Sequence, residues 1–127
     1  MTIVGVGIDV VETERMRAVL ARTPTFADRV FTAAEREYCR AKRDPTERFA
    51  ARFAAKEAVL KALDESILRI PLKQIEIVRS ETGKPFVQLY DKAAARAIEL
   101  GVTDWQISLT HTGLVAQAIA VASRERP

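Results

Sequence analysis

The chain has 127 residues, 48% of them hydrophobic and 29% charged, with 20 basic against 17 acidic side chains and a net charge of +3. A chain of this length buries roughly 65–70% of the surface that it exposes when unfolded, so we expect one domain over residues 1–127, and the composition excludes a mainly disordered protein. The single cysteine, Cys39, excludes a disulfide framework and a cysteine zinc site and indicates a reducing compartment.

The first predicted elements are a strand and a helix. Residues 3–11 are rich in β-branched side chains and predict a buried strand. This run is interrupted by Asp9, is far shorter than the ~20 residues of a membrane helix and lacks the features of a targeting segment, so we expect a cytoplasmic protein without a membrane partner. Residues 12–20 carry acids in the first turn and predict a helix that ends at Thr23-Pro24.

Two capping boxes then predict two more helices. Thr32 and Glu35 open a helix that runs to about residue 42. Residues 44–47 open the longest helix, with Asp44 as its cap and Pro45 at the first helical position. Its alanine-rich sequence predicts a helix to about residue 63.

The second half of the chain combines strands with one more helix. Asp91 caps this helix and Gly101 terminates it. The predicted strands are residues 74–78, 85–90, 105–110 and 114–122, with turns at 81–84 and 111–113. The element order predicts an α+β domain, with a mostly antiparallel sheet packed against one long and several shorter helices.

Asp9 does not fit a plain scaffold. A carboxylate inside an apolar strand costs several kcal/mol if it is buried without partners. A helix N-terminus, a basic residue or a cation should therefore compensate its charge. The alternative is a strand-end carboxylate that caps the helix beginning at Glu12.

Glu57 lies on the long helix, at the border of an apolar stripe. At ~100° per residue this stripe contains Phe49, Phe53 and Leu60. The simplest interpretation of Glu57 is an ion pair with Lys61, four residues further on, worth ~0.3–0.5 kcal/mol.

Basic side chains form a second stripe on the same helix, at Arg48, Arg52 and Lys56. A solvated face is the usual fate of such a stripe. The alternative is a track for several phosphates, because like charges at this spacing repel each other unless an anion lies between them. The only histidine, His111, begins a turn with hydroxyls and a glycine, which suits an anion site, although a lone histidine is more often structural.

Two other features carry no chemistry. Gly5 and Gly7 do not make a dinucleotide-binding motif, because the third glycine and the following helix spacing are missing. Cys39 has no nearby histidine and is expected to be a small buried hydrophobe.

Five segments, taken in chain order, match one family. They are Gly5-Val6-Gly7-Ile8-Asp9-Val10-Val11-Glu12, Phe26-Ala27-Asp28-Arg29-Val30-Phe31-Thr32 with Glu35, Arg52-Phe53-Ala54-Ala55-Lys56-Glu57-Ala58 with Lys61-Ala62, Gly83-Lys84-Pro85, and Ser108-Leu109-Thr110-His111-Thr112. Together they resemble the holo-acyl-carrier-protein synthases, a branch of the 4′-phosphopantetheinyl transferases, over nearly the whole chain. The chain departs from the family at Leu63-Asp64-Glu65-Ser66-Ile67, where many members have a Gly-Thr-Gly-like stretch.

This resemblance implies the fold of the 4′-phosphopantetheinyl transferases and a reaction. The enzyme would move phosphopantetheine from coenzyme A to a serine of apo acyl carrier protein, in support of fatty acid biosynthesis, and release adenosine 3′,5′-bisphosphate. The resemblance also implies Mg²⁺ dependence and a homotrimer with active sites between neighbouring subunits.

The family match also implies residue roles. Asp9 and Glu57 would bind Mg²⁺, which takes oxygen ligands and keeps several waters, and Lys61 would reach a phosphate. The remaining candidates for coenzyme A are Arg48, Arg52, His111 and Thr112 at its phosphates, and Lys84 and Pro85 beside the adenine. The base that takes the serine proton stays open between Glu57, a water on the metal and Asp28.

Three arginines are candidates for docking the carrier protein. Arg15 and Arg22 lie seven residues apart, two turns along one face of the first predicted helix, and Arg29 follows in the next motif. Acyl carrier proteins are acidic as a family, so these arginines would steer and hold the carrier. A solvated helix face is the alternative.

Two rival functions come from other classes. A small basic module for nucleic acid would need exposed aromatics among its basic residues, but only 6% of the chain is aromatic, so we expect no nucleic-acid partner. An inactive structural subunit of the same fold is the second rival. The combined presence of Asp9, Glu57, Lys61 and His111 argues against it.

Overall fold

The structure is a computed structural model that describes residues 1–126. In chain order its elements are β1 (Thr2–Glu12), α1 (Thr13–Arg22), α2 (Phe26–Val30), α3 (Ala33–Arg40), α4 (Thr46–Ala62), the 3₁₀ helix η1 (Leu72–Gln74), β2 (Ile75–Arg79), β3 (Pro85–Leu89), α5 (Asp91–Leu100), β4 (Asp104–His111) and β5 (Val115–Arg124). Within residues 1–126, no helix is both long and apolar enough to cross a membrane.

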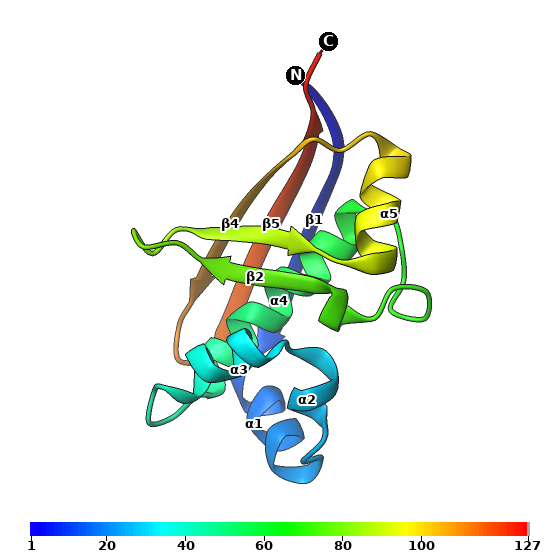
Figure 1. Ribbon diagram of the computed structural model, residues 1–127. Helices are drawn as coiled ribbons and strands as arrows, with labels where there is room; N and C mark the ends of the chain where they lie inside the picture. Colours follow the sequence, from blue (N-terminus) through cyan, green and yellow to red (C-terminus); the bar gives the residue numbers. More distant parts are fainter. Residues whose placement is uncertain (127) are drawn as a thin grey trace.

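The strands form two antiparallel sheets (Figure 1). The larger sheet has the order β1-β5-β4, and the smaller is the hairpin β2-β3. In the larger sheet, β1 pairs with β5 from Thr2 opposite Arg124 to Glu12 opposite Val115, which brings the two ends of the chain together. The predicted α+β fold is confirmed, with the predicted strands divided between two sheets.

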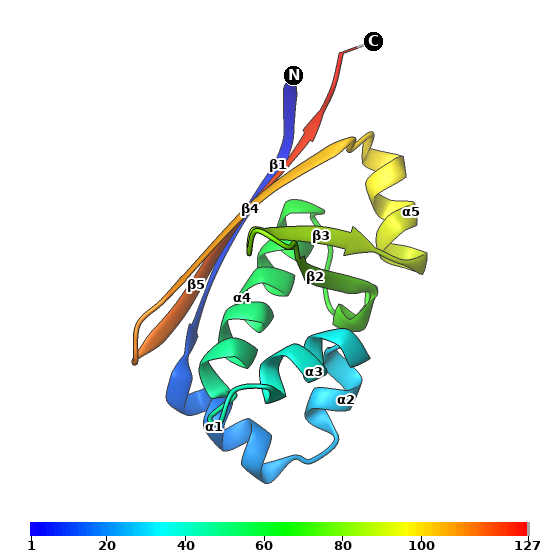
Figure 2. The ribbon, with the colours of Figure 1, turned by 60° about the vertical axis from the view of Figure 1, so that its left-hand side comes forward.

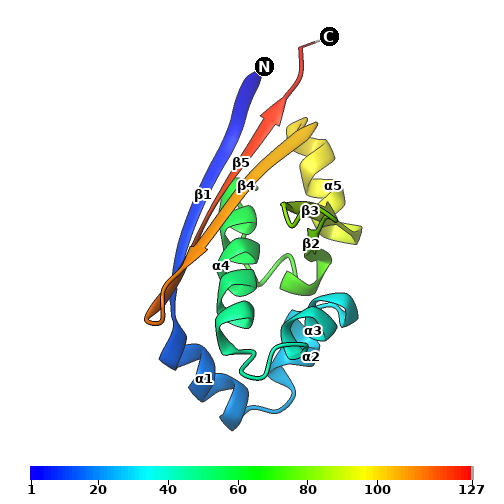
Figure 3. The ribbon, with the colours of Figure 1, turned by 90° about the vertical axis from the view of Figure 1, so that its left-hand side faces the viewer.

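Helix α4 lies between the two sheets. It packs along one face of β1-β5-β4, and the hairpin β2-β3 with α2 and α3 lies on its other side (Figure 2). Figure 3 shows the larger sheet edge-on, and no element of residues 1–126 covers its second face. Residues on α4 therefore reach the buried face of the large sheet, the hairpin and the small helices.

Small residues let α4 approach the large sheet closely. A Cβ added at Gly5 would lie 2.0 Å from the Ala62 carbonyl oxygen, and one added at Gly7 would lie 1.8 Å from that of Ala58. On β5, the inward-facing residues Ala116, Ala118, Ala120 and Ala122 are all buried. The two glycines are thus packing residues, in agreement with the absence of a dinucleotide-binding motif.

The core confirms most of the predicted apolar stripe. Phe49 and Leu60 are buried, and Phe53 is half-buried against both core clusters. Cys39 is fully buried, as predicted, and burial raises the pKa of its thiol to about 12.

The first capping box forms as predicted, and the second does not. Thr32 Oγ1 accepts from the Glu35 N–H, and Glu35 Oε1 accepts from the Thr32 N–H at 2.9 Å. Helix α4 begins one residue later than predicted, with Pro45 as its N-cap. Asp44 lies before the N-cap of α4, and its Oδ1 accepts from the Thr46 N–H at 3.1 Å.

Local pattern also misplaced the cap of α5 and missed two short elements. The N-cap of α5 is Tyr90, and Asp91 is its first helical residue, with a φ of 47°. The prediction of Gly101 as terminator is confirmed, at a left-handed φ of 77°. The short elements α2 and η1 were not predicted, because each is too short to show an apolar period.

The segment after α4, where the family's glycine-rich stretch is absent, is held by α5. The Arg96 Nε donates to the Leu63 carbonyl oxygen at 3.0 Å and lies 4.0 Å from Glu65. A side-chain clamp thus fixes this turn.

Candidate active site

Two cavities next to α4 contain most of the predicted site residues. The first, called here the carboxylate cavity, has a volume of about 380 Å³ and is lined by Asp9 of β1, Glu57 of α4 and Arg15 of α1. Its remaining walls include the apolar side chains of Met16, Phe26 and Phe53. The tertiary structure therefore places the two predicted metal ligands in the wall of one cavity.

The charge of Asp9 is compensated by Lys61. The Lys61 Nζ lies 3.1 Å from Asp9 Oδ1 and donates to the Ile8 carbonyl oxygen at 2.9 Å. The predicted Glu57–Lys61 pair is therefore wrong, because the lysine reaches across to the strand. The alternative of Asp9 as a helix cap is also wrong, since the N-cap of α1 is Glu12, without a side-chain hydrogen bond.

Glu57 has no ion-pair partner in the described part of the chain. Partial burial, and next the nearby Asp9 carboxylate, raise its pKa, while Lys61 acts in the opposite direction. Two carboxylates that repel each other on one cavity wall favour a bound cation. Within residues 1–126, no cluster of three or more His, Cys, Asp or Glu side chains is placed to hold a metal ion, so such a cation would need waters or substrate oxygens as further ligands.

The second cavity, called here the arginine cavity, has a volume of about 440 Å³. The predicted coenzyme A residues in its wall are Arg48, Arg52, Lys84, Pro85 and His111. They come from α4, from the β2-β3 hairpin and from the end of β4. An excess of positive charge makes this cavity suitable for a phosphate-rich ligand.

Arg48 and Arg52 both pack on the ring of Tyr38, on α3. Their guanidinium carbons lie 4.3 and 4.0 Å from the ring centroid, and Arg48 Nη1 donates to the Tyr38 carbonyl oxygen at 2.8 Å. Arg52 is 6% exposed, and its buried Nε has no hydrogen-bond partner in residues 1–126. A buried donor without a partner costs free energy. The Arg52 Nε is therefore a candidate donor to a ligand oxygen.

His111 and Thr112 begin the β4-β5 turn. The His111 Nδ1 lies 3.7 Å from Glu47 Oε2, and about half of the His111 side chain is exposed. The Thr112 Oγ1 accepts from the Leu114 and Val115 N–H groups. Thr112 thus stabilises the turn and does not line the arginine cavity.

Lys56 does not belong to the basic stripe that the sequence suggested. It is fully buried, and its Nζ donates to Glu35 Oε1 at 2.6 Å. Desolvation lowers its pKa, against the attraction of Glu35. The idea of a solvated face is wrong for Lys56 and Arg52, and the phosphate track is reduced to Arg48 and Arg52.

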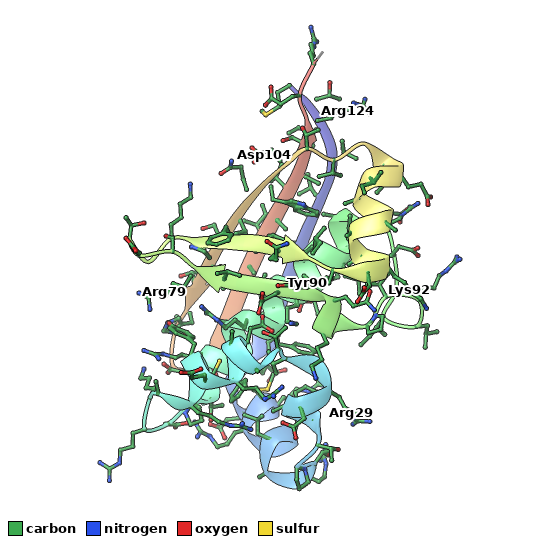
Figure 4. All side chains as sticks on the ribbon, in the orientation of Figure 1. Arg29, Arg79, Tyr90, Lys92, Asp104 and Arg124 are labelled. Carbon is green, nitrogen blue, oxygen red and sulfur yellow. The ribbon has the colours of Figure 1, made fainter. Side chains whose placement is uncertain are left out.

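The predicted docking arginines lie at the helical end of the molecule. Arg15 and Arg22 are exposed on α1, and Arg15 borders the carboxylate cavity. Figure 4 shows Arg29 on α2, at this helical end, away from Arg79 on the β2-β3 hairpin. The base candidate Asp28 pairs with Arg36 at 3.3 Å and lines neither cavity.

Two residues of the arginine cavity were missed from the sequence. They are Tyr38 and Arg79. Arg79 ends a strand before a predicted turn, and its position opposite Pro85 in the hairpin was the available signal. Nothing in the sequence indicated that Tyr38, on α3, would meet the arginines of α4.

Comparisons with known proteins agree with this geometry. A family model described as the 4′-phosphopantetheinyl transferase superfamily matches residues 5–117. A holo-[acyl-carrier-protein] synthase of Frankia casuarinae is 47% identical over 122 residues, which cover 96% of this chain and 98% of that protein. Its counterpart from Salinispora arenicola is 49% identical over 124 residues, 96% of this chain and 99% of that protein.

Solved structures are also similar. A holo-acyl-carrier-protein synthase of Plasmodium yoelii has a TM-score of 0.86 at 28% identity, covering 98% of this chain and 97% of its own. The synthase of Bacillus anthracis, solved in complex with CoA (3′,5′-ADP), has a TM-score of 0.81 at 29% identity, covering 98% of this chain and all of its own. With the full fold and the family profile in agreement, the chain belongs to the 4′-phosphopantetheinyl transferase superfamily.

Proposed function

We propose that this protein is a holo-[acyl-carrier-protein] synthase, a single transferase domain that works in the cytoplasm. It transfers 4′-phosphopantetheine from coenzyme A to a serine of apo acyl carrier protein. The observation that carries the proposal is the pair of cavities on α4, one lined by Asp9 and Glu57 and the other by arginines that form no ion pair within residues 1–126. The full-length relatives bear this name, and structures with CoA share the fold.

Asp9 and Glu57 are the residues that would hold Mg²⁺. When bound, the ion would neutralise charge on the pyrophosphate and help to align it for in-line attack. Lys61 holds the Asp9 side chain in place through its 3.1 Å contact. About half of the Lys61 side chain is exposed, and its ammonium has one N–H left for a phosphate oxygen.

In the reaction, one bond forms and one bond breaks at phosphorus. The serine hydroxyl gives its proton to a base, for which Glu57 is the candidate side chain in the carboxylate cavity. The serine oxygen bonds to the phosphorus that carries the pantetheine, and the bond from this phosphorus to the bridging oxygen breaks. The departing group is adenosine 3′,5′-bisphosphate. Arg48, Arg52 and His111 would bind its phosphates in the arginine cavity, with Lys84 and Pro85 beside the adenine and Thr112 stabilising the turn that carries His111.

We also propose that the protein forms a homotrimer. The uncovered face of the large sheet exposes a run of large apolar side chains, with Val6 56%, Ile8 60% and Val10 50% exposed on β1 and Ile119 40% exposed on β5. Such a contiguous patch favours a protein contact. The two cavities share no lining residue within one chain, and assembly would let the carboxylate cavity of one subunit meet the arginine cavity of the next.

The assembly has its own test. Replacing Ile8 with lysine would place a charge in the centre of the apolar face, so the variant should elute as a monomer by light scattering and lose transfer. The control, Ile98→Lys, changes an exposed isoleucine on α5, outside the large sheet. A wild-type monomer that is fully active would exclude the trimer.

The carrier protein would dock on the helical end. Exposed Arg15 and Arg22 on α1, next to the carboxylate cavity, are placed to attract an acidic partner, and Arg29 extends this surface onto α2. The acceptor serine would then reach the pyrophosphate held at Asp9 and Glu57.

The deciding experiment mixes the protein with coenzyme A, Mg²⁺ and apo acyl carrier protein. Mass spectrometry of the carrier should show one added phosphopantetheine group. An unmodified carrier at high enzyme concentration would reject the proposal in favour of an inactive member of the fold.

A further inference from the structure

A third arginine completes a cluster around one aromatic ring. The guanidinium carbon of Arg79, on β2, lies 5.4 Å from the centroid of the Tyr38 ring, next to those of Arg48 and Arg52. Its Nη1 also donates to the Tyr38 hydroxyl oxygen at 2.8 Å. Figure 4 shows Arg79 at the end of β2, beside the hairpin turn.

The charge of this cluster is unpaired among the described residues. No ion pair joins a carboxylate to Arg48, Arg52 or Arg79 in residues 1–126. Three like charges around one ring repel each other, and cation–π attraction offsets only part of this repulsion. The buried Arg52 Nε remains without a partner. Such a cluster is preorganised for an anion with several oxygens and more than one negative charge.

The turn between β2 and β3 also packs against the Arg79 side chain. Gly83 has a φ of +87°, and a Cβ added there would come within 3.1 Å of Arg79 Nη2. The turn therefore packs its glycine against the guanidinium, which limits the directions in which Arg79 can point. Tyr38 from one side and Gly83 from the other hold this side chain in the wall of the arginine cavity.

We propose that Arg79 is a further ligand-binding residue for the 3′-phosphate of coenzyme A, and that Tyr38 is the positioning residue that gathers Arg79 with Arg48 and Arg52. This inference rests on the proposed function. A phosphomonoester supplies three oxygens and close to two negative charges, and it is the group that distinguishes coenzyme A from dephospho-coenzyme A. Tyr38 itself acts through the arginines and needs no contact with the ligand.

The test measures dissociation constants for coenzyme A and dephospho-coenzyme A by calorimetry in Mg²⁺. Arg79→Gln should weaken coenzyme A by about tenfold or more, the effect of losing one charged hydrogen bond, with little change for dephospho-coenzyme A. Tyr38→Phe keeps the ring and removes only the hydroxyl, so it should give a smaller loss with the same selectivity. Arg69→Gln, at an exposed arginine outside this cavity, is the matched control.

A double variant separates positioning from general damage. If the Tyr38 hydroxyl acts through Arg79, Tyr38→Phe combined with Arg79→Gln should lose no more affinity than Arg79→Gln alone. Additive losses would overturn the role of Tyr38. Equal losses for both ligands, or none, in Arg79→Gln would overturn the role of Arg79 while the wild type still transfers. A wild type that binds neither ligand would instead overturn the proposed function.

Discussion

The carboxylate cavity and the arginine cavity are built on the same helix with opposite charge. In the first, Glu57 lies near Asp9, and this repulsion helps to raise its pKa. In the second, Arg48 and Arg52 share one tyrosine ring, and a buried guanidinium nitrogen has no partner among the described residues. Each cavity thus holds charge that the chain itself leaves unbalanced.

Lys56, between these two groups in the sequence, shows the contrast. Its charge is buried and is satisfied by Glu35 at 2.6 Å. Buried charges are normally paired, because desolvation is costly. Charge that stays unpaired at a cavity wall is therefore the feature that separates the proposed ligand-binding residues from structural ones on α4.

The largest effect is expected in the carboxylate cavity. Asp9→Ala and Glu57→Ala should each abolish transfer and leave the fold intact, because each removes an oxygen ligand for the cation. Carrier mass spectrometry measures transfer, and circular dichroism checks the fold. Glu14→Ala, at an exposed carboxylate on α1, is the control. Near wild-type turnover of both variants in saturating Mg²⁺ would show that this cavity binds no catalytic metal.

Lys56 should affect stability and not ligand affinity. Lys56→Met leaves the Glu35 carboxylate buried without its partner and should lower the free energy of unfolding by about 3–5 kcal/mol. Lys42→Met, in the exposed pair with Glu47, should cost only about 0–1 kcal/mol. Urea denaturation measures both. Similar losses would contradict the distinction between a buried and an exposed ion pair. Adding Glu35→Gln to Lys56→Met should restore part of the stability.

In the arginine cavity, Arg52→Ala and His111→Ala should weaken coenzyme A by about tenfold or more, and dephospho-coenzyme A by less. The reason is loss of charge-assisted hydrogen bonds to the 3′-phosphate. Titration with both ligands checks the difference. Equal losses on both ligands would move these residues to another part of the site.

A smaller effect is expected at the rim. Arg15→Glu should raise the KM for the carrier severalfold and leave coenzyme A affinity almost unchanged, because rim charges act mainly on association. The carrier KM of the wild type should also rise with ionic strength, and that of the variant should rise less. An unchanged carrier KM would place docking on another face.

The smallest effect concerns pH. The raised pKa of Glu57 means that the folded protein binds this proton more tightly than the unfolded chain does. In metal-free protein, stability should therefore fall as pH rises from the usual glutamate value of 4.5 through the higher folded pKa. Glu57→Gln should remove this part of the slope. The measurement is the difference between the thermal unfolding curves of the two proteins over pH, and identical pH dependence would mean that neither burial nor Asp9 raises the pKa of Glu57.

Local sequence was sufficient to predict the helices and caps that have strong periodic or capping signals. The Thr32–Glu35 box, the alanine-rich helix and the stop at Gly101 were predicted because neighbouring residues determine them. The motif resemblance singled out Asp9 and Glu57 before any geometry was known. Asp44, by contrast, was assigned a position one residue off, because Pro45 itself takes the N-cap position.

Only the tertiary structure decided which charges pair. The i,i+4 spacing predicted Lys61 with Glu57, but Lys61 reaches Asp9 on β1, fifty-two residues away in sequence. The same spacing grouped Lys56 with the arginines, although the packing of α3 buries it against Glu35. Helical spacing identifies only the neighbours of a residue on its own helix. The burial of a charged side chain and the identity of its ion-pair partner depend on elements that are distant in the chain.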